Sequence, residues 1–199
     1  MQLIDYKQIH DYFIIIVNAN LDHVKLNKGK KFCDFVRKCY AVQTAVGIRR
    51  HMKSDKKSIS LMRLLEQIKK CSRQFTYDFY TQCFPVDGGE WQKATFRNFT
   101  DDEKVFSEQK IEADIESLKK IAKTVENLVD QRVAHLDKRG YSEDVTYQDI
   151  DNSLDVFNKI ACKYLALLTG HGYITLKPEV QYNWKSIFTV PLDIRKFES

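Results

Sequence analysis

The chain has 199 residues, of which 43% are hydrophobic, and this size fits one domain with one substantial core. It contains only seven glycines and three prolines, too few for the frequent turns of an all-β fold, so the composition favours long helices. The net charge of +5 is a mild excess that alone excludes no class of partner.

Several classes of protein and site are not expected from the sequence. The longest apolar run, residues 13–17, is far shorter than the roughly 20 residues of a membrane span, and no basic segment followed by an apolar one opens the chain. We therefore expect a cytoplasmic protein with no membrane partner. The five cysteines are scattered, without a CxxC pair or a zinc-type histidine spacing, so we expect reduced structural thiols and no metal or cofactor.

The first third of the chain predicts three helices. Apolar residues at helical spacing indicate a buried first helix over residues 3–24. A second helix is expected from residue 32 to about residue 52, followed by a polar connection over residues 53–57. Ser58 or Ser60 is placed to cap a third helix. The apolar positions of that third helix are Leu61, Leu64, Leu65 and Ile68.

The middle of the chain is interrupted by helix-breaking residues. The helical signal extends into residues 75–84, which are rich in aromatic side chains, and Pro85 with the Gly88-Gly89 pair then ends it. Residues 85–100 include Trp91 and two phenylalanines without clear periodicity. We predict an ordered loop there, packed on the bundle.

The second half of the chain predicts two more helices. Thr100 and Glu103 have the spacing of a capping box, which indicates a long helix from there to about Leu136. Thr146 is expected to cap the next helix, and Gly170 stands where a left-handed helix end is expected.

Residues 171–199 contain two prolines and are predicted to form an irregular tail that wraps the bundle, with at most one short helix. No repeat, low-complexity segment or linker divides the chain. We therefore predict one all-α domain, a helical bundle over residues 1–199.

Residues 49–73 form a basic strip, with nine lysines and arginines against two acids. Such a strip can neutralise the phosphates of a nucleic acid. It can equally be a solvated helix face, and residues 101–155 are net acidic, so the two regions can also attract one another within or between chains. As nucleic-acid-binding candidates we take Arg49, Arg50, His51, Lys53 and Arg63.

Two polar residues lie close to the apolar stripe of the predicted long helix. At 100° per residue, Arg132 falls within the stripe of Val125, Leu128 and Leu136, and His135 lies at its edge. A buried guanidinium requires a carboxylate, a carbonyl, a phosphate or another subunit as its partner. One interpretation is a functional site. The other is an internal ion pair together with a basic helix end that the helix dipole stabilises.

The segment 132–138, Arg-Val-Ala-His-Leu-Asp-Lys, resembles a segment of the AbiU-like, abortive-infection branch of the HEPN superfamily. Residues 32–68 resemble the second and third helices of the same family, and residues 182–191 resemble its C-terminal tail. The resemblance implies a HEPN-like helical bundle with a long late helix, commonly a homodimer.

The resemblance further implies that the Arg and His of the late helix meet their symmetry mates in a cleft. In active HEPN proteins this cleft cleaves RNA without a metal ion. His135 would then be the general base or acid, Arg132 the phosphate clamp, and Asp130 a polar neighbour able to orient His135. The chain would be a metal-independent ribonuclease or toxin-like RNA-targeting protein of a phage-defence or toxin–antitoxin system, with a cognate antitoxin as a partner.

The spacing of the motif departs from the family pattern, because the arginine stands three residues before the histidine rather than four to six. An alternative function follows from this departure. The chain would be a non-catalytic HEPN module that binds RNA, a nucleotide or a protein partner. A third is a purely structural protein in which Arg132 and His135 serve only a dimer interface.

Overall fold

The computed structural model describes residues 2–22, 29–84, 89–129, 146–177 and 185–186. These residues form seven α-helices and one short 3-10 helix, η1 (Ser72–Gln74). The α-helices are α1 (Gln2–Ala19), α3 (Lys30–His51), α4 (Leu61–Lys70), α5 (Tyr77–Cys83), α6 (Gly89–Arg97), α7 (Glu108–Val129) and α8 (Tyr147–Thr169). The prediction of an all-α bundle is confirmed.

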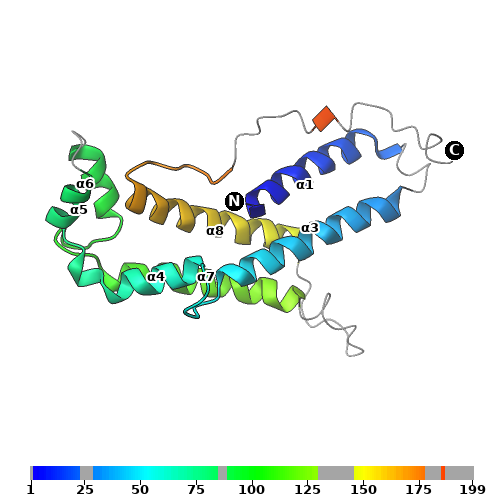
Figure 1. Cartoon of the computed structure of the whole chain (residues 1–199). Coiled ribbons are helices and arrows are strands. Elements are labelled where there is room, and N and C mark those ends of the chain that lie inside the picture. The colour runs from blue at the N-terminus through cyan, green and yellow to red at the C-terminus, as the bar shows by residue number, and fades with distance from the viewer. Residues whose placement is uncertain (1, 23–28, 85–88, 130–145, 178–184, 187–199) are drawn as a thin grey trace.

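The four long helices form the body of the bundle (Figure 1). α1 packs on α3, α3 packs on both α7 and α8, and α7 packs on α8. α4 lies along α7, and the short helices α5 and α6 pack on each other at one end of the molecule. None of the helices in the described part of the chain is long and apolar enough to cross a membrane.

One large core holds these helices together. Burial of apolar area stabilises it by roughly 25 cal/mol for each Å² removed from water. Its fully enclosed side chains include Ile48 of α3, Leu65 of α4, Leu118 of α7 and Leu154 of α8. Toward α5 and α6 the core becomes aromatic, and its rings there belong to Phe75, Tyr80, Phe96, Phe99, Phe106 and Tyr164.

A half-buried ion pair joins α7 to α8. Lys163 Nζ lies 2.6 Å from Asp114 Oδ2, and the Tyr164 hydroxyl donates to the same oxygen at 3.0 Å. Burial and the nearby Asp114 carboxylate both raise the pKa of Tyr164, which therefore keeps its proton. The pair fixes how the two helices lie against each other.

Three predicted helix ends are confirmed by their hydrogen bonds. Ser60 caps α4, because its hydroxyl accepts from the backbone N–H of Arg63 at 3.2 Å. Thr146 and Asp149 form a capping box at the start of α8. Gly170 ends α8 with a φ of 69°, a left-handed conformation that glycine adopts without steric cost.

The predicted loop over residues 85–100 is wrong for most of its length, because α6 occupies residues 89–97. Its buried residues are Gln92 and Phe96, four residues apart, and because the first of them is polar, a search for apolar periodicity misses this face. The Gln92 amide is satisfied by donating to the carbonyl oxygen of Phe84.

The predicted start of the long helix at Thr100 is also wrong, because α7 begins at Glu108. The Thr100 hydroxyl donates to Asp102, and that carboxylate accepts from the backbone N–H of Lys104 at 3.0 Å, which closes a turn instead. Glu103 has a φ of 60°, which no right-handed helix allows. The predicted end near residue 136 lies outside the described residues.

Candidate nucleic-acid interface

The three catalytic candidates Arg132, His135 and Asp130 lie outside the described residues. The five nucleic-acid-binding candidates are all described, and they lie at the end of α3, in the following connection and on α4. The structure therefore describes the candidate residues of the basic strip.

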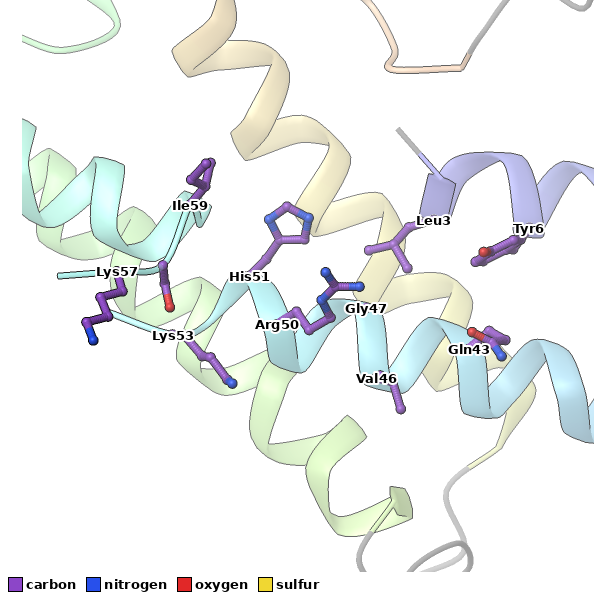
Figure 2. Close-up of a pocket in the computed structure, with 11 residues that line it drawn as sticks. Leu3, Tyr6, Gln43, Val46, Gly47, Arg50, His51, Lys53, Lys57 and Ile59 are labelled. Carbon is purple, nitrogen blue, oxygen red and sulfur yellow. The ribbon is translucent and has the colours of Figure 1, made fainter. Parts of the chain in front are cut away.

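A cleft of about 690 Å³ opens at the C-terminal end of α3, where the start of α1 and the connection over residues 53–60 approach it (Figure 2). The end of α3 and the connection supply its charged side chains, and α1 supplies part of its apolar wall. The residues that line the cleft are Leu3, Tyr6, Gln43, Val46, Gly47, Arg50, His51, Lys53, Lys57, Ser58 and Ile59.

The end of α3 places cations at this cleft for a local reason. Its last turn carries Arg49, Arg50 and His51, and the negative end of the helix dipole favours positive side chains there. Arg50 and His51 line the cleft, whereas Arg49 is exposed on the same turn outside the lining. Two of the three predicted contacts on this turn thus face one space.

Hydrogen bonds fix the connection that follows. The Asp55 carboxylate accepts from the Ser58 hydroxyl and from the backbone N–H of Lys57. The Ser60 hydroxyl donates to the carbonyl oxygen of Lys53, and Arg63 Nη1 donates to the carbonyl oxygen of Ser58 at 2.9 Å. Arg63 therefore holds the wall of the cleft in place and does not line it.

The cleft is positively charged without compensation from its own walls. Arg50, Lys53 and Lys57 line it, and no aspartate or glutamate is among the lining residues that the structure describes. A cleft lined by several cations and no acid attracts anions, phosphates in particular. Lys57 belongs to the basic strip but was not among the predicted contacts, and its place in the strip is the signal that could have identified it.

Further along the strip, the positive charge is partly neutralised. Lys69 Nζ lies 2.5 Å from Glu112 Oε2, and Arg73 Nε lies 3.8 Å from Glu108 Oε1. Both pairs join the region of α4 to the start of α7. The C-terminal end of the basic strip therefore forms ion pairs with acids of the chain, and its N-terminal end lines the cleft.

His51 is the titratable side chain of the cleft. Its ring is half-buried, lies 5.1 Å from the ring of Phe157 on α8, and has its Nδ1 enclosed without a hydrogen-bond partner. Burial foremost lowers the pKa of His51 below its usual range, and the neighbouring Arg50 charge is among the smaller causes that act in the same direction. The imidazole is consequently neutral near pH 7 and able to accept a proton.

The register of α4 on α7 shows which part of α7 lies nearest to the start of α4. Lys69 pairs with Glu112, while Glu66, three residues earlier, lines a hollow together with Lys119. The two helices are therefore antiparallel, and the start of α4, with the cleft wall before it, lies toward the C-terminal half of α7.

The described residues contain no group of three or more His, Cys, Asp or Glu side chains placed to hold a metal ion. No curated protein and no solved structure matches the chain. The model of the HEPN AbiU2 family matches residues 3–185, which is most of the sequence. The matched region includes every helix described above except for the first residue of α1. The chain belongs to the AbiU2 family of HEPN domains.

Proposed function

We propose that this HEPN domain is a metal-independent ribonuclease of an abortive-infection or toxin–antitoxin system. The observation that carries the proposal is the cleft at the end of α3, which Arg50, Lys53 and Lys57 line without an acid among the described lining residues. A cleft of this charge fits an RNA backbone, and membership of the family supports RNA as the anion.

In this proposal, the cleft binds the RNA strand and the motif after α7 performs the chemistry. His135 takes the proton from a ribose 2′-hydroxyl, whose oxygen then forms a bond to phosphorus while the bond to the 5′-oxygen breaks. Arg132 binds the phosphate and stabilises its developing charge, and Asp130 orients His135. The leaving 5′-oxygen receives a proton from water, and the hydroxide that remains takes the proton held by His135.

We further propose that the protein acts in the cytoplasm as a homodimer and is restrained by a cognate antitoxin protein. In a homodimer, the segment around Arg132 and His135 of each protomer meets its symmetry mate, so that two half-sites form one cleavage cleft. The net acidic stretch over residues 101–155 supplies opposite charge for contacts between copies.

One observation favours a second function, a non-catalytic HEPN module that binds RNA, a nucleotide or a protein partner. Arg132 and His135 are three residues apart, a shorter separation than the pattern of active family members. A module of this kind binds RNA in the basic cleft without turnover, and its affinity falls as salt rises.

Cleavage of a mixed RNA pool in excess chelator tests the first proposal. We expect cleavage by the wild type and a loss of about 10²- to 10⁴-fold in His135→Ala, the usual range for general acid–base catalysis. Arg132→Ala should lose activity as well, whereas His171→Ala, which removes an exposed histidine on the described tail, should not.

Unchanged cleavage by His135→Ala at matched purity and oligomeric state would show that the catalytic assignment is wrong. A folded wild-type protein that binds RNA and does not cleave it would instead support the binding module.

A further inference from the structure

The basic cleft continues into a second, smaller groove. This groove has a volume of about 170 Å³ and lies between α1 and α3. Tyr6 and Gln43 line both spaces, so the two spaces adjoin at these side chains. Figure 2 shows Tyr6 on α1 and Gln43 on α3 reaching toward one another. The groove is lined by Tyr6, Ile9, His10, Val36, Cys39, Tyr40 and Gln43.

The shared face of α3 sets the distance between the groove and the cations. Cys39, Gln43 and Arg50 lie on one side of the helix, at spacings of four and seven residues. At a rise of about 1.5 Å per residue, Gln43 and Arg50 are roughly 10 Å apart along the axis. A strand with a phosphate at Arg50 therefore reaches the groove within a few nucleotides.

The chemistry of the groove differs from that of the cleft. Its described lining residues include no lysine, arginine, aspartate or glutamate, so it offers nothing to a phosphate. It offers apolar and aromatic surface instead, and Tyr6, His10 and Tyr40 are its aromatic lining residues. Gln43 is exposed and presents an amide that both donates and accepts hydrogen bonds.

His10 supplies a second observation at the same place. Its side chain is only 7% exposed, and both of its ring nitrogens are enclosed without a hydrogen-bond partner. A polar ring left unsatisfied in a lined groove costs stability that an entirely apolar groove would not. The accessible lining of the groove is almost entirely apolar, which suits the face of an aromatic ring.

We propose that this groove is a nucleobase subsite of the basic cleft. An unstacked base of single-stranded RNA enters it against Tyr6, while neighbouring phosphates bind Arg50 and Lys53. The Gln43 amide hydrogen-bonds to the edge of the base. A paired base is held within its stack and does not enter, so the subsite selects single strands. The inference rests on the proposed function for its RNA ligand.

Binding of a short, fluorescently labelled 2′-O-methyl RNA, which the proposed chemistry cannot cleave, tests the subsite. The comparison ligand has the same backbone with abasic sugars. We expect the wild type to bind the base-bearing strand about five- to a hundredfold more tightly, the usual effect of aromatic stacking on a base. Gln43→Ala and Tyr6→Leu should lose most of this preference.

Two variants control for the fold. Tyr6→Phe keeps the ring and should keep the preference, which separates stacking from packing because Tyr6 also contacts the core. Tyr173→Ala removes an exposed tyrosine that lines neither space and should behave as the wild type.

Equal binding of the two ligands by the wild type would overturn the subsite, as would an undiminished preference in both Gln43→Ala and Tyr6→Leu. The ribonuclease proposal would survive either result if natural RNA were cleaved. A base preference without cleavage would leave the subsite standing and remove the ribonuclease. A wild type that binds neither ligand would overturn the RNA cleft and the subsite together.

Discussion

His10 lies between the rings of Tyr40 and Tyr147, and the nearest charged side chains offer it no direct hydrogen bond. The Tyr40 hydroxyl donates to Asp151 Oδ1 at 2.5 Å, and Lys7 Nζ lies 3.5 Å from the same oxygen. Burial lowers the pKa of His10 more than Asp151 and Asp11 raise it, and Arg37 and Lys7 lower it further. The folded chain therefore holds His10 neutral.

This arrangement predicts a loss of stability in acid. The folded pKa of His10 is below the unfolded value of about 6.5, so the unfolded chain binds the proton first as pH falls. The contribution of His10 to the free energy of unfolding is complete above about pH 6.5 and is lost progressively as the pH falls toward the folded pKa. His51 has a lowered pKa as well and acts in the same direction.

Urea unfolding of wild type and His10→Phe at pH 7 and pH 5 measures the effect. We expect the variant to lose less stability between the two pH values, because a phenyl ring keeps the stack on Tyr40 and takes up no proton. At pH 7 it should be more stable by about 1 kcal/mol, since it removes unsatisfied polar atoms. Parallel losses in the two proteins would show that His10 does not resist protonation.

At the scale of helices, Leu3 of α1 packs tightly on α3 at Gly47, where α3 has no side chain. A Cβ atom built on Gly47 would lie 2.1 Å from Leu3 Cδ2, and Leu3 is buried and lines the basic cleft. Glycine in the middle of a helix costs about 1 kcal/mol relative to alanine. The close contact between the two helices explains why α3 keeps a glycine there.

Gly47→Ala should therefore destabilise the protein even though alanine favours helix. Overpacking a core costs about 1–3 kcal/mol, which exceeds the gain of about 1 kcal/mol in helix propensity. We expect a net loss of about 1 kcal/mol in urea unfolding. Gly172→Ala is the matched control, because nothing lies within 4 Å of its added methyl group. A Gly47→Ala variant more stable than the wild type would contradict the packing of α1.

The sequence predicted helix ends where local chemistry decides them. Ser60, Thr146 and Gly170 act through neighbours within a few residues, so their spacing sufficed. The predicted helix start at Thr100 was wrong because a serine or threonine before an acid can close a turn as readily as it caps a helix. Asp102 accepts a hydrogen bond from the Thr100 hydroxyl and completes the turn. Nothing in the spacing from Thr100 to Glu103 distinguishes the two outcomes.

Exposure was harder to predict than helicity. Phe32 and Phe35 have the spacing of a core face, and α3 does contain them, yet they are 62% and 61% exposed. The second helix instead buries Cys33, Tyr40 and Ile48 among others. Which side of α3 faces the core is set by α1, α7 and α8 together, and a single helix period does not contain that information.

At the scale of the whole molecule, the candidate site was partly predictable. Arg50, His51 and Lys53 are neighbours in the chain, so a local excess of charge identified them. The contribution of α1 was not predictable, because Leu3 and Tyr6 reach the cleft only through the packing of helices about forty residues apart in the sequence. The catalytic candidates, Arg132 foremost, stay predictions because they lie outside the described residues.

The salt dependence of single-stranded RNA binding tests most directly whether RNA binds through the cations of the cleft. The variant replaces Arg50, Lys53 and Lys57 by serine. The control replaces Lys30, Lys31 and Lys38, three exposed lysines of α3, and removes the same charge. These control positions are roughly 18 Å or more from Arg50 along the helix, beyond the Debye length of about 10 Å at 0.1 M salt.

Each phosphate contact on a single strand contributes about −0.7 to the slope of log affinity against log salt. We predict that the cleft variant binds more weakly and has a slope smaller in magnitude by about 2, while the control variant keeps a slope close to that of the wild type. Equal slopes for the two variants would contradict the account, because RNA would then respond to net charge and not to the cleft.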